Sequence, residues 1–371
     1  MKKILPVNTK TFINSECWTF FRTAIIDTSD SGRDWICTHY NLCMNRHRQI
    51  MFGDKEYHYT FDHYSSILDY DEIELNNTAD IIKTMREGIL NEEYFLLNCN
   101  SEYLLTGQYA PLDPKSIHEY LFYGFDDEKQ TFQYLSIRGR KGVVESEIAY
   151  DTLGIIYKEM LIYYCQNPGE RFSFATWNNY PITKIKLKPY RTRDSAFIYQ
   201  VLHRLRVYLD GAVVYNNFYD SNGNVTSVNQ YKNYIGLGCF IGLIELIEDR
   251  LESGECNNIT RYPINILLSI KKLCEHRKIF IEALNRLAAK LKCKTNDIDI
   301  LLQAYKQTSV NIDVCFADII KYDQTENIEL LKGIKEKLLE VYREEQNLLD
   351  RLNAFIHHCL CIQYQTFGIY D

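Results

Sequence analysis

A cysteine lies near the start of the chain, where a helix is expected to begin. Asn14 and Ser15 are of the types that favour helix caps, and the segment 17–26 is largely apolar without Gly or Pro. This pattern places Cys17 in the first turn of a helix. Unpaired backbone N–H groups and the helix dipole favour a thiolate there, so Cys17 is a candidate nucleophile.

A cysteine nucleophile needs a base that takes its proton, and we expect that base on a separate, rigid element. His118 begins the segment 118–135, in which two apolar stretches flank a polar turn. The segment is therefore predicted to be a β-hairpin with His118 at the start of its first strand. A Cys on an early helix and a His on a later hairpin is the arrangement of papain-like enzymes.

A structural alternative applies to both residues. The chain contains twelve Cys and nine His, so a Cys followed by a His at this spacing also arises by chance. In that case Cys17 is a small apolar residue of the core, and His118 has no chemical role.

The sequence HEYLFYGFDDEKQTF, which begins at His118, resembles the histidine strand of bacterial cysteine peptidases that cleave double-glycine leader peptides. Gly124 and Asp126 stand at the matching positions. The chain resembles more closely the butirosin-type acyltransferases, also in NCNSEYLLTGQYAPLDPKSIH (98–118) and LLSIKKLCEHRKIFIEAL (267–284). This resemblance implies an α+β fold, with a papain-like cysteine-peptidase-type domain followed by a mostly α-helical C-terminal domain.

The resemblance also implies a reaction. An acyl group passes from a carrier-protein thioester to Cys17 and then to a small amine, for example 1,3-diaminopropane, in thiotemplated natural-product biosynthesis. The partners would be an acyl carrier protein and that amine, with no cofactor except the phosphopantetheine that the carrier brings. Two alternatives stay open: a cysteine peptidase that cleaves a leader peptide, and a non-catalytic scaffold with a degenerate peptidase fold.

Papain-like sites need two further groups. One is an oxyanion donor, which the peptidases place six residues before the Cys; Thr11 stands there, so Asn14 is the nearest side-chain amide. The other group orients the His. The peptidase spacing points to Tyr134, with Gln133 beside it and Asp113 as a weaker candidate, or the site works as a Cys–His dyad. These differences from the peptidase pattern weigh more against peptidase activity than against acyl transfer.

The formal net charge of −7 argues against nucleic acid as a partner. A basic stretch opposes this charge, and its lysines alternate along a predicted strand, so they share one face. Its members are Lys184, Lys186, Lys188, Arg191 and Arg193. The stretch is a candidate docking surface for an acidic carrier protein or a phosphate. The alternative is a solvated edge strand that lysines protect from aggregation.

Two clusters contain the ligand types that zinc prefers. The first consists of Cys37, His39, Cys43 and His47, and the second of His357, His358, Cys359 and Cys361. The first matches none of the well-known spacings of structural zinc sites, and the second is a weak candidate. Ordinary positions on helices and loops are therefore favoured, and no metal is expected.

The length of 371 residues suggests one large or two ordinary domains. The turn-forming residues Gln166–Gly169 give the best boundary, between a papain-like catalytic domain over 1–168 and a mostly helical domain over 169–371. The start of the chain lacks the apolar segment of a signal peptide, and no run is long enough to span a bilayer. We therefore expect no membrane partner and a cytoplasmic location, where the cysteines remain thiols.

Finer patterns predict individual elements. Ser146–Tyr164 is amphipathic and expected to be helical, whereas the polar stretch Asn216–Asn233 is long enough for a functional loop or lid. Apolar residues recur at helical spacing over 266–291, 298–322 and 331–359. These stretches predict three long antiparallel helices.

Overall fold

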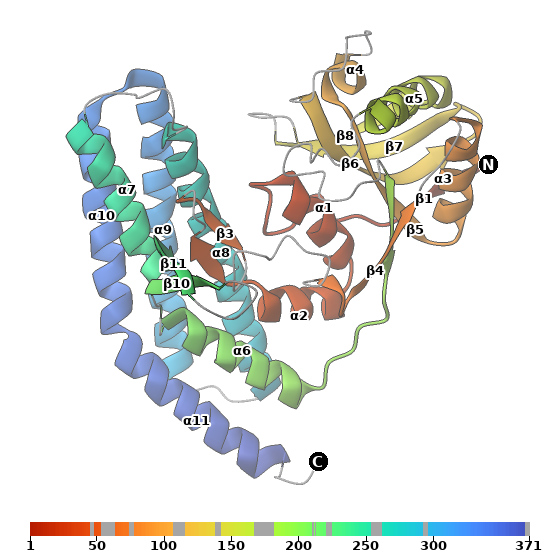
Figure 1. Cartoon of the computed structure of the whole chain (residues 1–371). Coiled ribbons are helices and arrows are strands. Elements are labelled where there is room, and N and C mark those ends of the chain that lie inside the picture. Colours follow the sequence, from red (N-terminus) through yellow and green to blue (C-terminus); the bar gives the residue numbers. More distant parts are fainter. Residues whose placement is uncertain are drawn as a thin grey trace. The chain divides into compact units, whose positions relative to one another are not determined.

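The computed structural model of the chain describes residues 1–44, 48–52, 64–73, 78–106, 116–137, 142–166, 182–209, 211, 213–219, 225–253, 262–291 and 296–367. Helices and antiparallel sheets make it an α+β protein. The chain forms two compact units (Figure 1). Unit 1 comprises Met1–Arg33 and Tyr59–Tyr190, and unit 2 comprises Asp34–His58 and Arg191–Asp371.

This division differs from a single boundary between residues 168 and 169. The strand Ile182–Leu187 joins the sheet of unit 1, and the segment Asp34–His58 belongs to unit 2. The predicted boundary itself falls largely within 167–181, outside the described residues. Turn signals are local, so they cannot reveal an exchange that depends on contacts between distant segments.

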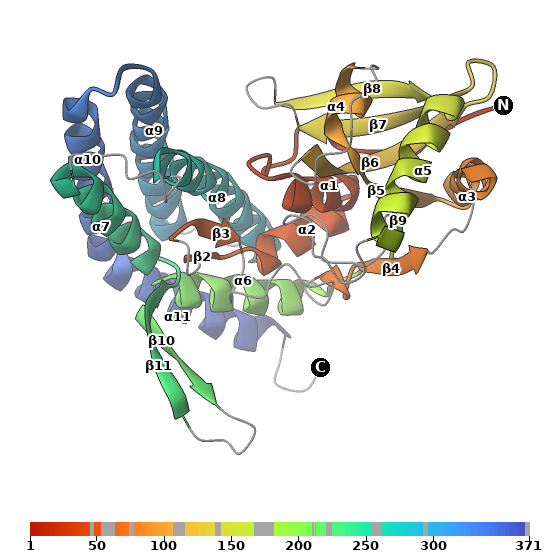
Figure 2. The ribbon, with the colours of Figure 1, turned by 45° about the horizontal axis from the view of Figure 1, so that its top comes forward.

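Unit 1 is built around a seven-stranded antiparallel sheet (Figure 2). Six strands follow in the order β4 (Leu68–Ile73), β9 (Ile182–Leu187), β5 (Glu93–Asn100), β6 (Ile117–Asp126), β7 (Thr131–Ile137) and β8 (Val143–Ala149), and β1 (Lys2–Ile4) also pairs with β6. The predicted hairpin over 118–135 is present as β6 and β7, with Leu121 opposite Leu135. The helix expected over 146–164 begins later, as α5 (Tyr150–Gln166), because the preceding residues form the edge strand β8.

Helices cover both faces of this sheet. On one face, α3 (Thr78–Leu90) brings Gly88 against the ring of Phe95, which pairs with Phe122 on β6. On the other face, α1 (Cys17–Ile26) contacts Glu119 through Arg22. Glu119 and Phe122 are three positions apart on β6, so their side chains point to opposite faces.

A short turn connects α1 to α2 (Asp30–His39). The backbone N–H of Gly32 donates to the hydroxyl of Ser29 at 3.0 Å. A Cβ atom on Gly32 would lie 1.8 Å from the carbonyl oxygen of Ile26. Only glycine therefore permits this close approach of the two helices.

Unit 2 is mainly helical. Its helices are α6 (Asp194–Leu209), α7 (Gly238–Ser253), α8 (Tyr262–Leu291), α9 (Asn296–Thr325), α10 (Ile328–Asn347) and α11 (Leu349–Phe367). The helices predicted over 266–291 and 298–322 are present as α8 and α9. The third predicted helix is present as two helices, α10 and α11, because α10 ends at the C-cap residue Leu348. No Gly or Pro marks this break in the sequence.

Two small hairpins complete unit 2. They are β2 (Leu42–Met44) with β3 (Ile50–Phe52), and β10 (Val213–Tyr219) with β11 (Val225–Tyr234). The second replaces most of the loop or lid expected over 216–233, so that prediction is wrong. Hairpin pairing uses backbone N–H and C=O groups, which polar side chains do not remove.

The core of unit 2 contains a buried ion pair. Arg277 of α8 donates to the carboxylate of Glu345 on α10, and both side chains are fully buried. The hydroxyl of Tyr208 donates to Glu345 Oε2 at 2.5 Å and accepts from Arg277 Nη2 at 2.8 Å. Burial raises the pKa of Glu345, and Arg277 opposes that rise.

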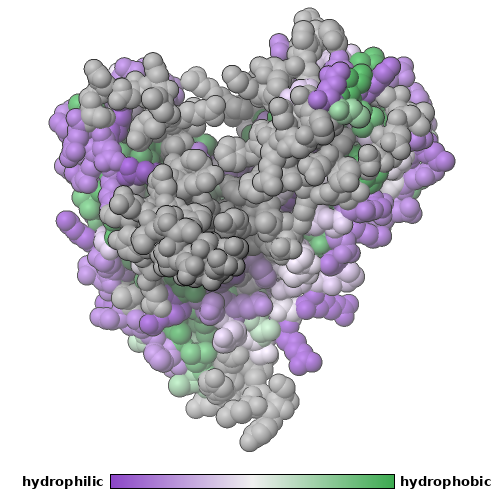
Figure 3. Space-filling view, in the orientation of Figure 1, coloured by the Kyte–Doolittle hydropathy of each residue, from purple (hydrophilic) through white to green (hydrophobic). Residues whose placement is uncertain are grey.

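No helix in the described part of the chain is long and apolar enough to cross a membrane. On the face shown in Figure 3, hydrophilic residues dominate the described surface. Apolar side chains gather mainly inside each unit, as the buried residues of the long helices and central strands show.

We predict that Arg277→Met lowers the free energy of unfolding by about 3–5 kcal/mol, because it leaves the Glu345 carboxylate buried without a counter-charge. Urea denaturation followed by circular dichroism measures this loss. The double variant Arg277→Met/Glu345→Leu should recover most of it, since no buried charge remains. A double variant as unstable as the single one would show that packing, not charge, dominates.

Candidate active site

Cys17 is the first residue of α1, as the sequence predicts. The residue before it, Glu16, is the N-cap in an extended conformation, and its side chain makes no capping bond to the helix. Instead, its carboxylate accepts a hydrogen bond from the hydroxyl of Thr19. The following residues, Trp18–Ile26, are all buried, so the sulfur projects from the end of a firmly packed helix.

His118 is the second residue of β6, and the fold brings it to Cys17 although 101 positions separate them. The sulfur of Cys17 lies 3.6 Å from Nδ1 and 3.8 Å from Nε2 of the imidazole. Cys17 is half-buried and His118 is exposed. A molecule in solution can therefore reach both groups.

A backbone hydrogen bond selects the tautomer of His118. The N–H of Glu119 donates to Nδ1 at 3.1 Å. In the neutral ring, Nδ1 therefore carries the lone pair and Nε2 carries the proton. The nitrogen nearer to the sulfur therefore carries the single lone pair that could take the thiol proton, and its bond from the Glu119 N–H must break when it does so.

A buried ion pair lies next to Cys17 and His118. The guanidinium of Arg22 donates to both carboxylate oxygens of Glu119, at 3.0 and 3.1 Å. It also donates to the backbone oxygen of Trp18 at 2.8 Å and lies 3.5 Å above the indole ring. Trp18 follows Cys17 and Glu119 follows His118, so the pair ties together the backbones that carry the two site residues.

The ionisation of Cys17 differs from the sequence expectation. Burial raises the pKa of its thiol, and the carboxylates of Glu119 and Glu16 raise it further. The backbone N–H of Trp18 and the charge of Arg22 oppose this rise without cancelling it. A helix start contributes only about 0.3–1 kcal/mol, whereas burial can shift a pKa by several units. Burial and the two carboxylates thus act against the resting thiolate that the sequence predicts.

His118 keeps solvent-accessible surface, but the protein atoms packed around its ring partly desolvate it and lower its pKa below the ordinary value, and Glu119 acts in the opposite direction. Near pH 7 both shifts favour a neutral thiol and a neutral imidazole over a preformed thiolate–imidazolium pair. The neutral pair can do nucleophilic chemistry when the imidazole takes the thiol proton as the sulfur attacks.

The two expected positions for an oxyanion donor are both in the described chain. Asn14 is exposed, three residues before Cys17. Thr11 is buried, and its hydroxyl has no hydrogen-bond partner among the described residues. The backbone N–H of Trp18 already interacts favourably with the sulfur of Cys17, so the start of α1 supplies a donor at the site.

Two of the residues expected to orient His118, Tyr134 and Gln133, lie on β7 opposite positions farther along β6. Tyr134 pairs with Phe122, and its hydroxyl donates to the backbone oxygen of Leu104 at 3.4 Å, while the ring of Tyr120 stands between it and His118. Gln133 pairs with Gly124, farther along the strand. The register of the hairpin, which the sequence does not specify, causes this displacement. Asp113 lies outside the described residues.

The basic stretch is neither a positive face nor an edge strand. Its strand, β9, lies between β4 and β5. Lys184 contacts Asp71 at 3.2 Å and Glu93 at 3.4 Å, and Lys188 contacts Asp69 at 2.9 Å. Lys186 donates to a backbone oxygen, and Arg191 and Arg193 belong to unit 2. Three carboxylates thus balance the three lysines, and docking has no support here.

The described members of the Cys and His clusters take ordinary structural positions. His39 stacks on Trp35, Cys43 is buried in β2, and His47 lies outside the described residues. On α11, His357, His358 and Cys361 are exposed and Cys359 is buried. Among the described residues, no group of three or more His, Cys, Asp or Glu side chains is placed to hold a metal.

Arg22 and Glu119 are the residues that the sequence interpretation missed. A signal was present, because Arg22 interrupts an apolar helix and Glu119 interrupts an apolar strand. A charge on a buried element requires a partner of opposite charge, so the presence of Arg22 and that of Glu119 each indicated the need for such a partner.

No family model matches the sequence, and no curated protein matches it. The geometry around Cys17 and His118, together with the local resemblance of the sequence, is therefore the basis for a function.

We predict that iodoacetamide alkylates Cys17 at least about tenfold more slowly than the exposed Cys361 at pH 8, because a raised pKa leaves little thiolate. The rate at Cys17 should keep rising up to pH 10. Peptide mass spectrometry over pH 5–10 measures both sites in the same sample, and Cys165, which is also exposed, is a second reference. Fast alkylation that is independent of pH between 5 and 8 would instead show a resting ion pair.

The Arg22–Glu119 pair should also set the pKa of His118. Glu119→Gln removes the carboxylate that raises this pKa, so the pKa should fall. Arg22→Met leaves that carboxylate unbalanced, so the pKa should rise while the protein loses about 3–5 kcal/mol of stability. Histidine NMR titration measures the shifts, with His118→Gln to assign the signal. Shifts in the same direction would disprove electrostatic control.

Proposed function

We propose that the protein is a cysteine-dependent acyltransferase with a papain-like catalytic unit, which forms an amide from a carrier-protein thioester and a small amine. The approach of Cys17 Sγ to His118 Nδ1 at 3.6 Å carries this proposal. A helix that begins with Cys17 and a hairpin that carries His118 are the two elements such a unit requires. The similarity of the segment at His118 to the butirosin-type acyltransferases supports the choice of acyl transfer.

In the first step, the thiol of Cys17 attacks the carbonyl carbon of the incoming thioester. His118 Nδ1 takes the thiol proton as the new carbon–sulfur bond forms. The pantetheine sulfur then leaves and receives that proton from the imidazolium. The products are an acyl-cysteine thioester and the free carrier thiol.

In the second step, the amine nitrogen attacks the acyl carbon on Cys17. Its excess proton passes to His118, the amide leaves, and the Cys17 sulfur is protonated again by the imidazolium. Both steps begin from a neutral imidazole, which its lowered pKa keeps available at pH 7. The sulfur loses its proton only during the attack, so its raised pKa does not prevent the reaction.

The backbone frame supports these roles. Arg22 and Glu119 fix the residues next to Cys17 and His118, so the reacting atoms do not have to find each other during each turnover. The amide N–H of Glu119 donates to Nδ1 and so keeps the neutral ring in the tautomer with a lone pair on Nδ1; this bond breaks when Nδ1 takes the thiol proton. These contacts thus orient His118 without the expected side chain from β7.

We predict that acyl-pantetheine thioesters (acetyl, hexanoyl and benzoyl) add one acyl mass to the wild type, and that 1,3-diaminopropane then removes it as the amide. Cys17→Ala should abolish the adduct, and His118→Gln should slow its formation by about 10²–10⁴-fold. Intact-mass and peptide mass spectrometry locate the adduct. Quenched samples taken over time give the rate.

Cys99→Ala is the matched control, because Cys99 is a buried cysteine that pairs with His118 in the sheet but makes no contact used in the reaction. It should retain the adduct. An acyl group on another cysteine, or a His118→Gln variant with the wild-type rate, would contradict the Cys–His assignment. Cleavage of a double-glycine leader peptide without any transfer to the amine would favour the peptidase instead.

A further inference from the structure

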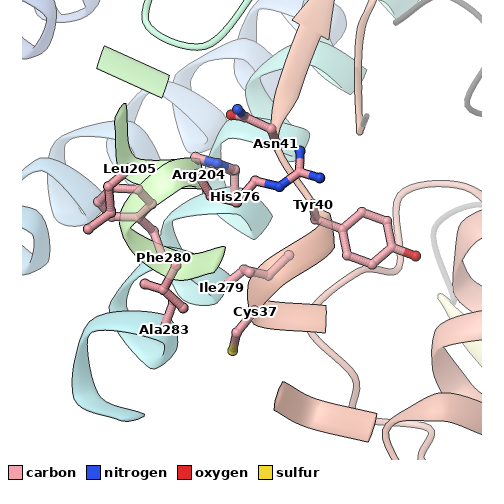
Figure 4. A pocket seen from close by; sticks show the side chains of 10 residues that line it. Cys37, Tyr40, Asn41, Arg204, Leu205, His276, Ile279, Phe280 and Ala283 are labelled. Atoms are coloured by element: carbon pink, nitrogen blue, oxygen red, sulfur yellow. The ribbon is translucent and has the colours of Figure 1, made fainter. Parts of the chain in front are cut away.

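A small pocket lies within unit 2, between the end of α2, α6 and α8, and Figure 4 shows its lining side chains. Its volume is about 10 Å³, which is room for about one water-sized species. Ten residues line it, and none of them carries a carboxylate. The amide of Asn41, the guanidinium of Arg204 and the ring of His276 gather at one end, and apolar side chains lie at the other (Figure 4).

Asn41 lines this pocket and carries a buried hydrogen-bond donor. Its side chain is 1% exposed, and its oxygen accepts from the backbone N–H of Leu42 at 2.9 Å. That bond identifies which amide atom is Oδ1 and which is Nδ2. The remaining Nδ2 group is buried and has no partner within the described part of the chain. A buried amide N–H₂ without an acceptor is unfavourable, so the position calls for one.

His276 supplies a second donor. Its Nδ1 lies 3.5 Å from Nη1 of Arg277, and a guanidinium only donates, so Nδ1 accepts and Nε2 carries the hydrogen. Burial and the charge of Arg277 lower the pKa of His276, so the ring stays neutral in this tautomer. Its stacking on Tyr208, with ring centroids 5.1 Å apart, holds the ring in place.

Arg204 supplies a permanent positive charge. Its Nε donates to the backbone oxygen of Thr38 at 2.8 Å, which anchors the side chain along the end of α2. The rest of the guanidinium faces the pocket beside Asn41 (Figure 4). The hydroxyl of Tyr40, in contrast, points away from the pocket (Figure 4). Among the described lining residues, the polar end thus combines donors and a positive charge, and none of these residues carries a carboxylate.

We propose that this pocket binds a small monovalent anion of chloride size, held by Asn41, Arg204 and His276. A water molecule needs acceptors as well as donors, whereas an anion accepts from every group that points at it. The volume excludes larger organic acids. The bound anion would link the residues that follow α2 to the helices α6 and α8. It would thereby stabilise the folded state of unit 2.

Thermal unfolding at constant ionic strength tests the proposal. Potassium gluconate at 0.3 M, whose anion is too large for the pocket, is replaced stepwise by potassium chloride. The wild type should gain about 2–4 °C in its midpoint with saturation. Asn41→Asp keeps the acceptor for Leu42 but replaces the Nδ2 donor by a carboxylate oxygen, so its midpoint should not depend on chloride.

Arg204→Gln should lose most of the chloride-dependent gain. Arg206→Gln is its matched control, because it removes the same charge from the exposed side of the same helix and should keep the gain. An equal chloride response in the wild type and Asn41→Asp would show a general salt effect and overturn the proposal.

Crystals grown in bromide give an independent readout that does not depend on any variant. Anomalous scattering should show bromide within about 3.5 Å of Asn41 Nδ2 and the Arg204 guanidinium. Bromide confined to the outer surface, with water or nothing in the pocket, would overturn the proposal even if the unfolding midpoint responded to chloride.

Discussion

The bidentate ion pair between Arg22 and Glu119 is the constraint on which the candidate site depends. Helix α1 carries Cys17 and the sheet carries His118, and these elements are far apart in the sequence. Arg22 reaches Glu119, the backbone of Trp18 and the Trp18 indole at once. A buried charge pair tolerates little displacement, because each partner loses its compensation when the other moves. The distance between sulfur and imidazole is therefore a property of the fold as much as of the two residues.

The same ion pair also influences the ionisation of the two candidate site residues. Glu119 lies next to His118, and its negative charge acts on both reacting groups, raising the pKa of Cys17 and of His118. Burial affects the two in opposite directions and favours the neutral form of each. Both shifts favour a protonated sulfur at rest, which limits unwanted reactions of an accessible cysteine.

The sequence was sufficient for the features that local pattern determines. The start of α1 at Cys17, the hairpin that begins at His118 and the long helices α8 and α9 follow from apolar periodicity and turn residues. Features that depend on partners could not be predicted. The ladder register moves Tyr134 away from His118, the neighbours of β9 neutralise its lysines, and the hairpin β10–β11 forms from a polar stretch. In each case, the deciding contact comes from residues distant in the sequence.

The discontinuous composition of the two units has a consequence for synthesis of the chain. The segment Asp34–His58 leaves the ribosome early, but the helices of its own unit follow only after residue 191. Likewise, β9 fills the space between β4 and β5 only when residue 187 has been made, long after both neighbours. During translation, these parts therefore expose apolar surface and unpaired strand edges until their partners are made. Such a state favours aggregation. Slow translation or chaperone binding over the first two hundred residues should consequently affect the yield of this protein more than that of one built from consecutive domains.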